Sequence, residues 1–177
     1  KILDAKILAG NIYQMVVEAP RVAKRCLPGQ FIIVKLDETA ERVPLTICDY
    51  DREAGTVTIV FQPVGASTSK YKFLKAGDAF EDFVGPLGQP SDLCTDPLVY
   101  PQEKWLHEHG IDADVIIGAK TKDLVILEDE MKKVAANVYV TTDDGSYGRS
   151  GMVTKVIDDL ITEEGKTYDH CVAIGPM

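Results

Sequence analysis

Residues 56–68 carry the pattern that decides the fold of the first half of this chain, and they read TVTIVFQPVGAST. Residues 56–61 are mostly β-branched and end in an aromatic residue, which is typical of a strand. Gly65 and the small residues up to Thr68 favour the start of a short helix, whose free backbone N–H groups bind phosphate oxygens. An ordinary helix N-cap gives the same pattern, so both interpretations stay open for this stretch alone.

Further strand patterns surround this stretch in the first half of the chain. They occupy residues 2–8, 12–18, 30–36, 43–49 and 79–84. Glycine, proline and aspartate mark turns between several of them. Six short strands at this spacing predict a closed antiparallel barrel of the Greek-key type.

The pattern changes after residue 90. Helical periodicity alternates with short apolar segments: helices are expected at 100–109, 122–134 and 152–161, and strands at 114–118, 137–141 and 170–174. This alternation predicts a parallel sheet with helices on both faces. We therefore expect a β-barrel domain over residues 1–92 and an α/β domain over residues 98–177.

The composition argues against several classes of function. The chain has 177 residues and a net charge of −9, which opposes binding to nucleic acid or to an anionic membrane surface. No apolar run approaches the ~20 residues of a membrane span, and the charged N-terminus is unlike a secretory signal. The four cysteines form no CxxC pair, so we expect no metal site, and free thiols in a reducing cytoplasm.

A second informative stretch is residues 42–47, which read RVPLTI. Arg42 precedes a proline, which lacks a backbone donor, and Thr46 adds a hydroxyl. This set is suited to hold a pyrophosphate and the edge of a ring. The alternative is an edge strand with a surface arginine.

Together with Gly85-Pro86-Leu87-Gly88, these two stretches resemble the flavin domain of the ferredoxin–NADP reductase superfamily. The resemblance continues through 99–102, 118–120, 141–148 and 173–177. Within the superfamily, the chain is most similar to the small subunits of NADH-dependent ferredoxin:NADP oxidoreductases, also known as sulfide dehydrogenase subunits. The electron-transfer subunits of dihydroorotate dehydrogenase are near relatives.

The resemblance implies an FAD site in the barrel and an NAD(H) site in the α/β domain. The residues expected at FAD are Arg42, Pro44, Leu45, Thr46, Phe61, Gln62, Gly65, Ser67 and Thr68. Those expected at NAD(H) are Gly118, Ala119, Asp143, Asp144, Gly175 and Pro176. One departure concerns the arginine, because matching Thr46 to the family's hydroxyl puts Val43 at the usual arginine position.

The carboxylates of Asp143 and Asp144 predict a preference for NAD(H) over NADP(H). A carboxylate accepts hydrogen bonds from ribose hydroxyls and repels a 2′-phosphate. The alternative is that Asp143-Asp144-Gly145 only forms a turn. Lys120 and Arg149 are the cations that could offset the preference.

The function implied by the resemblance is electron transfer between NAD(H) and an iron–sulfur acceptor through FAD, within an electron-bifurcating complex. The expected partners are a larger flavoprotein or iron–sulfur subunit, forming a heterodimer, and ferredoxin or a similar carrier. No catalytic side chain is expected, because the flavin carries the chemistry. Two alternatives stay open: the electron-transfer subunit of dihydroorotate dehydrogenase, and a non-catalytic interaction module that retains the fold.

Two further departures concern segments that the family has. The family implies a 2Fe–2S cluster, but this chain has no cysteine-rich segment to hold it. Only Leu93 to Val99 precede the helix expected near Tyr100, and seven residues reach at most ~25 Å, too little for a linker, a strand and a glycine-rich turn. We therefore expect residues to be missing between Leu93 and Val99 and after Met177.

Overall fold

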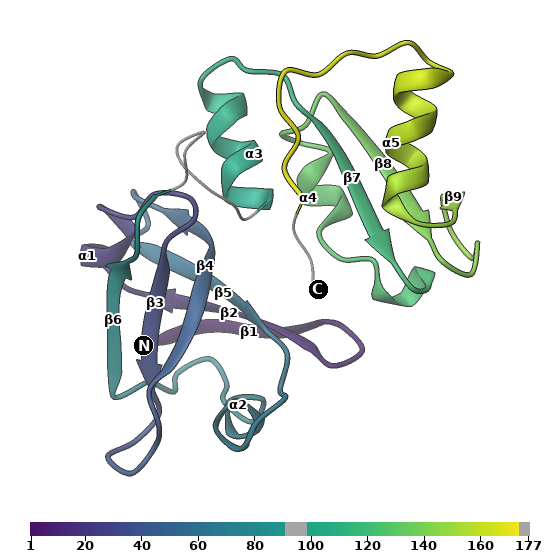
Figure 1. Ribbon diagram of the computed structural model, residues 1–177. Coiled ribbons are helices and arrows are strands. Elements are labelled where there is room, and N and C mark those ends of the chain that lie inside the picture. The colour runs from purple at the N-terminus through teal and green to yellow at the C-terminus, as the bar shows by residue number, and fades with distance from the viewer. Residues whose placement is uncertain (91–98, 174–177) are drawn as a thin grey trace. The chain divides into compact units, whose positions relative to one another are not determined.

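The computed structural model describes residues 1–90 and 99–173, with the side chains of 99–102 left out. The chain divides into two compact units, Lys1–Gln102 and Glu103–Met177 (Figure 1). The domain bounds expected at residues 92 and 98 fall outside the described residues and stay a prediction.

The first unit is a six-stranded antiparallel sheet in the order β1-β2-β5-β4-β3-β6. Its elements are β1 (Ile2–Ala9), β2 (Ile12–Glu18), α1 (Pro20–Ala23), β3 (Phe31–Lys35), β4 (Val43–Asp51), β5 (Thr56–Phe61), α2 (Ala66–Tyr71) and β6 (Asp82–Leu87). The sheet curls until Ile2 meets the segment that leads into β6. The amide of Ile2 donates to the carbonyl of Asp78 at 2.7 Å, and the amide of Gly77 donates to the carbonyl of Ile2 at 2.9 Å. These bonds fasten the first strand to the far side of the barrel.

The barrel core follows from the alternation of the strands. Ile32 and Val34 on β3 are fully buried, as are Val57 and Ile59 on β5. Tyr71, at the end of α2, adds a fully buried ring that meets the Phe61 ring edge-on at 5.9 Å. This apolar interior anchors α2 against the sheet, because each buried large side chain contributes about 1.5–3 kcal/mol.

The last strand of the barrel differs from the expectation. A strand was expected at 79–84 with a turn at 85–88, but β6 starts at Asp82 and continues to Leu87. Leu87 pairs with Phe31 after a register shift. A side chain at Gly85 would overlap Ile32, so glycine lets β6 pass close to β3. The glycine and proline therefore lie within the strand rather than after it.

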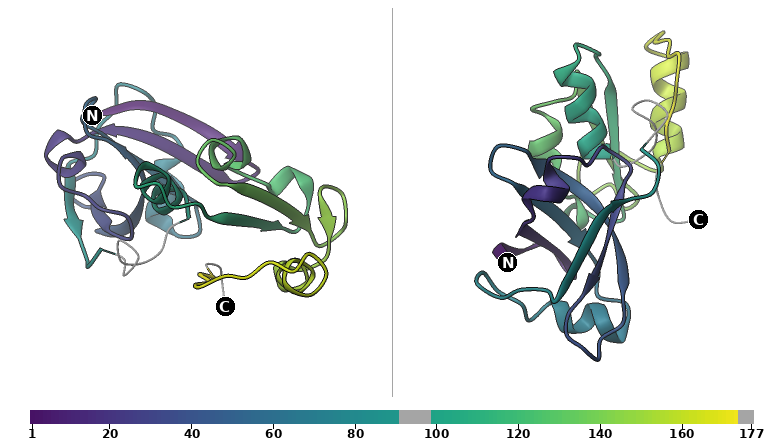
Figure 2. Two further views of the ribbon diagram at one scale, coloured as in Figure 1. Left: turned by 90° about the horizontal axis from the view of Figure 1, so that it is seen from above. Right: turned by 90° about the vertical axis from the view of Figure 1, so that its left-hand side faces the viewer.

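The second unit contains a three-stranded parallel sheet in the order β7-β8-β9. Its elements are α3 (Val99–Glu108, whose first residues belong to the first unit), β7 (Asp114–Ala119), the 3-10 helix η1 (Lys122–Leu124), α4 (Glu128–Met131), β8 (Asn137–Thr142), β9 (Arg149–Ser150) and α5 (Val153–Thr162). The helix α5 lies on one face of the sheet and α4 on the other (Figure 2). The antiparallel barrel and the parallel α/β sheet confirm the predicted fold class.

Two predicted elements of this unit are wrong. The helix expected over 122–134 is broken into η1 and α4, because Leu127 has a left-handed backbone with φ of 60°. The strand expected at 170–174 is irregular over 170–173, and residue 174 lies outside the described residues. The amphipathic pattern of 152–161 did predict α5, whose Val156 and Leu160 are buried against the sheet.

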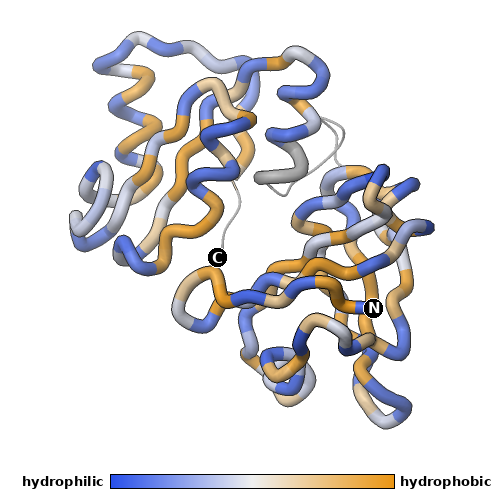
Figure 3. Tube along the Cα trace, turned by 180° about the vertical axis from the view of Figure 1, so that it is seen from behind, coloured by the Kyte–Doolittle hydropathy of each residue, from blue (hydrophilic) through white to orange (hydrophobic). Residues whose placement is uncertain are grey.

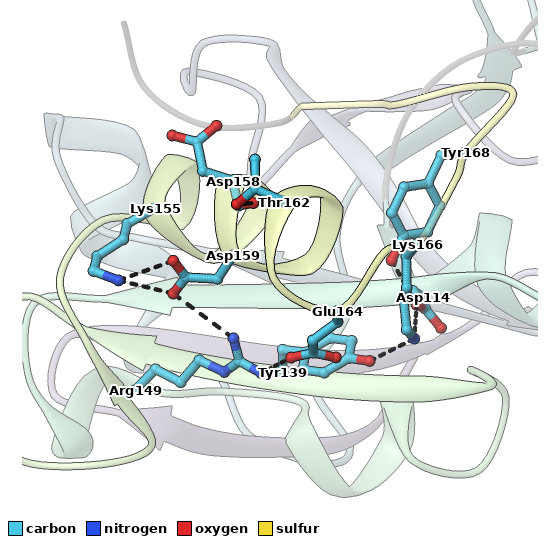
Figure 4. Close-up of polar contacts among 10 residues, drawn as sticks. All are labelled: Asp114, Tyr139, Arg149, Lys155, Asp158, Asp159, Thr162, Glu164, Lys166 and Tyr168. Carbon is cyan, nitrogen blue, oxygen red and sulfur yellow. Dashed lines mark hydrogen bonds and ion pairs between the residues drawn. The ribbon is translucent and has the colours of Figure 1, made fainter.

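A polar cluster on the second unit ties the segment after α5 to the sheet (Figure 4). Lys166 Nζ donates to Asp114 Oδ2 and to the Tyr139 hydroxyl, both at 2.6 Å. The Tyr168 hydroxyl and Asn137 Nδ2 also donate to the Asp114 carboxylate, at 2.8 and 2.7 Å. We call these residues, Asp114, Asn137, Tyr139, Lys166 and Tyr168, the Asp114 cluster.

The Asp114 cluster predicts a pH-dependent contribution to stability. Burial acts most strongly on the pKa of Asp114 and raises it, but the hydrogen bonds from Lys166, Asn137 and Tyr168 outweigh burial and hold the pKa below its usual value. A lowered folded-state pKa stabilises the fold above the unfolded pKa of ~3.9 and loses that effect as the pH falls through the folded value. Asp114→Asn should lower the melting temperature of the second unit by roughly 5–10 °C at pH 7.

Thermal unfolding from pH 7 to pH 2 tests this prediction. The difference between wild type and Asp114→Asn should shrink below pH ~4 as the wild-type carboxylate takes up its proton. Asp112→Asn is the matched control, since Asp112 is an exposed carboxylate two residues earlier. A gap between wild type and Asp114→Asn that stays constant across this range would contradict the assignment.

Figure 3 shows the distribution of hydropathy along the trace, with apolar segments concentrated in the strands of both units. Among the described residues, no helix combines the length and the apolar character that spanning a membrane requires.

Candidate functional site

The outward face of β4 carries the first group of expected FAD residues. Pro44 and Thr46 are exposed, whereas Leu45 between them packs against the core. Arg42 precedes the strand, and its guanidinium Nη2 lies 2.7 Å from Asp82 Oδ2 on β6. The structure therefore presents a hydroxyl and a proline on one surface, with the arginine held beside them by a carboxylate.

The start of α2 brings a second group to the same part of the barrel. Ser67 Oγ donates to Glu41 Oε2 at 3.1 Å, and Glu41 is the immediate neighbour of Arg42. Thr68 Oγ1 accepts from the amides of Gly65 and Val64, at 3.1 and 3.2 Å. Thr68 thus serves as a capping hydroxyl, one of the two interpretations left open above. The contact between Ser67 and Glu41 thus brings the 65–68 stretch next to the residue that precedes the 42–47 stretch.

The ring of Phe61 does not lie on this surface. It is 5% exposed and stacks on Tyr13 at 5.8 Å within the barrel core. The alternation of β5 sends Phe61 inward, on the same side as Val57 and Ile59. Gln62, which follows the strand, is exposed. Of this pair, only the Gln62 side chain is positioned to meet a ligand on the surface.

The second unit has a pocket of about 320 Å³ at the carboxyl ends of β7 and β8 and at the start of α5. Ligands bind at this edge of open α/β sheets, where strand ends and helix starts converge. The lining residues are Gly118, Ala119, Lys120, Thr141, Asp143, Met152, Val153 and Thr154. Three of the expected NAD(H) residues, Gly118, Ala119 and Asp143, line this pocket. Asp144 does not, and Gly175 and Pro176 lie outside the described residues.

A close approach between β7 and α5 shapes this pocket. A Cβ on Gly118 would overlap the Cγ1 of Val153, in the first turn of α5. Thr141, which is 1% exposed, lies on β8 with its hydroxyl 3.1 Å from the carbonyl of Arg149. Glycine at 118 therefore allows the helix start to reach the strand ends.

Sequence reasoning missed the contributions of Thr141, Met152, Val153 and Thr154 to the pocket. Their signal was the start of an amphipathic helix soon after a strand, which in an α/β unit faces the strand ends. Only the folded structure shows that the start of this helix contacts Gly118, which is more than 30 residues earlier in the sequence.

The loop after β8 is folded on itself. The amide of Tyr147 donates to Thr142 Oγ1 at 3.0 Å, and that hydroxyl donates back to the Tyr147 carbonyl at 2.8 Å. Thr142 is fully buried. The loop that carries Asp143 is therefore held in one conformation by the strand end itself.

The described residues provide no cluster of three His, Cys, Asp or Glu side chains that would hold a metal. Cys26 is buried and Cys171 exposed, and Cys94 lies outside the described residues. Burial raises the pKa of the Cys26 thiol to about 11, so this thiol stays protonated at neutral pH.

Comparison with known proteins identifies relatives along nearly the whole chain, although no family model matches. The chain is 50% identical to the uncharacterized protein in the adh 3′ region of Clostridium beijerinckii, over all of this chain and 66% of that protein. The alignment runs over 196 positions for the 177 residues present here. The relative thus has about 19 residues that face a gap in this chain.

Two further comparisons carry functional names. The chain is 32% identical to the dihydroorotate dehydrogenase B (NAD(+)) electron transfer subunit of Fusobacterium nucleatum, over 96% of this chain and 72% of that protein. It superimposes with a TM-score of 0.82 and 35% identity on a structure of NADH-dependent reduced ferredoxin-NADP oxidoreductase solved to study flavin-based electron bifurcation. That match covers 92% of this chain and 63% of the other. The chain spans about two thirds of the length of these relatives. The predicted resemblance is confirmed, and the chain belongs to the family of dihydroorotate dehydrogenase B electron transfer subunits, within the ferredoxin reductase fold superfamily.

Proposed function

We propose that this chain is a flavoprotein oxidoreductase subunit that passes electrons between NAD(H) and an iron–sulfur acceptor through FAD, in an electron-bifurcating complex of the cytoplasm. The observation that carries the proposal is the similarity over 92% of the chain to the NADH-dependent ferredoxin-NADP oxidoreductase structure. Its partners would be a larger flavoprotein or iron–sulfur subunit and ferredoxin or a similar carrier.

The barrel unit offers side chains that fit FAD. When bound, FAD supplies the exchange between two-electron and one-electron chemistry. Arg42 and Ser67 would hold the pyrophosphate, since a guanidinium and a hydroxyl both donate to phosphate oxygens, and the Ser67 hydroxyl would turn from Glu41 to the phosphate on binding. Their contacts with Asp82 and Glu41 bring these donors to one surface. Thr46 would hold the edge of the ring, because its hydroxyl is exposed on β4.

The second unit would orient the nucleotide. The pocket at the ends of β7 and β8 would receive the adenosine half of NAD(H), with Asp143 on the ribose hydroxyls. Gly118 lets the start of α5 approach the strand end, and both Gly118 and Ala119 line the pocket. The chain's own residues bind and position the reactants, which is the role expected of a protein whose cofactor carries the reaction.

We also propose that residues are missing from this sequence before α3. The 19 or so additional residues in the C. beijerinckii protein support an insertion in the relatives. We place it between Leu93 and Val99, a segment outside the described residues.

Flavin content and reduction test the proposed function. The full-length polypeptide should purify yellow with a flavin absorption band, and anaerobic NADH should bleach it. Ser67→Ala should weaken FAD binding by on the order of ten-fold, because one donor to a charged oxygen is lost. Ser69→Ala, two residues further along α2, is the control. A folded, colourless protein that takes up no FAD would overturn the proposal and leave the non-catalytic interaction module.

A second candidate is the electron transfer subunit of dihydroorotate dehydrogenase, which the name of the F. nucleatum relative favours. The partner decides between the two. Mass spectrometry of the copurified large subunit, together with assays of dihydroorotate oxidation and of ferredoxin-linked NADP reduction, separates them.

A further inference from the structure

The two adjacent carboxylates after β8 have different surroundings. Asp143 lines the pocket at the strand ends, together with Lys120 and Thr154. Asp144 is the next residue along the chain, but it is not among the residues that line this pocket. The two carboxylates have the same charge, but only Asp143 lines the pocket, so the two residues can have different roles.

Asp144 is engaged inside the loop. Its Oδ1 accepts a hydrogen bond from the Ser146 hydroxyl at 2.6 Å and another from the Ser146 amide at 3.0 Å. The same two bonds hold the pKa of Asp144 below its usual value, with the hydroxyl contributing most. The charged form of this carboxylate is thus part of the folded loop.

Ser146 extends this contact to the neighbouring loop. Its hydroxyl oxygen accepts a hydrogen bond from the amide of Lys122 at 2.8 Å. Lys122 begins η1, which follows β7. Tyr147 adds a second link, because its hydroxyl donates to Glu128 on α4 at 3.1 Å. Asp144 therefore connects, through Ser146, the loops after β7 and β8. The first residues of these two loops, Lys120 and Asp143, line the pocket.

Asp143 is anchored through its backbone and lines the pocket. Its amide donates to the Ala119 carbonyl at 3.0 Å, which fixes the residue at the ends of β7 and β8. The side chain is exposed. A carboxylate so placed accepts hydrogen bonds from both hydroxyls of a ribose and repels a phosphate on the same sugar.

We propose that Asp143 alone reads the ribose of the dinucleotide and sets the preference for NAD(H), whereas Asp144 is a positioning residue that braces the pocket through Ser146 and Lys122. This inference rests on the proposed function, because it takes the pocket to be the nucleotide site. It revises the expectation that both carboxylates face the ligand.

The matched variants Asp143→Asn and Asp144→Asn separate the two roles. The probes are ADP-ribose and 2′-phospho-ADP-ribose, whose dissociation constants from the full-length protein are measured by calorimetry. Asp143→Asn should shift the ratio of the two constants toward the phosphorylated probe by at least about ten-fold, since ~1.4 kcal/mol of repulsion is a factor of ten. Its melting temperature should stay close to that of wild type.

Asp144→Asn should weaken the binding of both probes by the same factor and lower the melting temperature of the protein. The ratio of the two dissociation constants should remain within about two-fold of wild type, because the lost interaction is equal for both ligands. Ser146→Ala should reproduce this result, and combining the two changes should add little, since they break one chain of contacts. If Asp144→Asn lowered the melting temperature but left both dissociation constants unchanged, Asp144 would have a structural role only, and its assignment as a positioning residue would be overturned.

The outcomes distinguish this inference from the function on which it rests. A ratio that moves as much in Asp144→Asn as in Asp143→Asn, or in neither, overturns the division of roles while nucleotide binding stands. Failure of wild type to bind either probe overturns the inference together with the nucleotide half of the proposed function. Flavin content, measured on the same samples, reports separately on the FAD half.

Discussion

Gly148→Ala is expected to lower the melting temperature of the second unit by roughly 12–24 °C, about 3 kcal/mol for a domain of this size. Gly148 has a left-handed backbone with φ of 65°. An added Cβ would also overlap the carbonyl oxygen of Val140, a backbone atom of β8 that cannot swing aside. The left-handed conformation costs about 1 kcal/mol for a residue with a side chain, and the overlap accounts for the rest.

Gly165→Ala is the matched control for this prediction. Gly165 has nearly the same φ, 67°, but nothing lies within 4 Å of the position of an added Cβ. Gly165→Ala should therefore lower the free energy of unfolding only by the conformational cost, about 1 kcal/mol, which lowers the melting temperature by roughly 4–8 °C. Calorimetric melting of both variants measures the difference. Equal losses would show that the contact with Val140 relaxes freely.

Gly118→Val is expected to reduce NADH-dependent flavin reduction by on the order of 100-fold while flavin content stays unchanged. The new side chain would occupy the pocket and push Val153 away from β7. Overpacking of this kind costs typically 1–3 kcal/mol, and here the cost falls on the ligand as well as on the helix start. The barrel is a separate compact unit, so it should retain its FAD.

Steady-state kinetics with increasing NADH measure this effect. The Michaelis constant should rise most, because the substitution removes space for the ligand rather than a reacting group. Ile117→Val changes the neighbouring residue on the same strand, which does not line the pocket, and serves as the control. Unaltered kinetics in Gly118→Val would place the nucleotide elsewhere.

The fold could be predicted largely because alternation along strands is a local property. Ile32 and Val34 occupy alternate positions of one strand, as Val57 and Ile59 do, and all four are buried. This alternation is visible in the sequence. The failures came where a single residue overrides a pattern. Leu127 adopts a left-handed conformation and divides a segment whose apolar spacing is helical.

The candidate site was less accessible to sequence reasoning. The sequence singled out Gly118 and Asp143 because each lies at the end of a predicted strand, and in the structure both line one pocket. The different surroundings of Asp143 and Asp144 depend on Ser146 and its contact with the Lys122 amide, which joins residues 24 positions apart. No local pattern carries such a contact, since it arises from the pairing of β7 with β8.

The bonds between Ile2 and residues 77–78 also bear on synthesis of the chain. During translation β1 emerges before its closing partners, which follow some 75 residues later. Until then the nascent barrel exposes an unprotected strand edge, of the kind that pairs with other chains and leads to aggregation. Asp4 and Lys6 lie on this strand. Charges at such an edge oppose intermolecular pairing, so Asp4 and Lys6 would reduce aggregation of the nascent chain until the barrel closes.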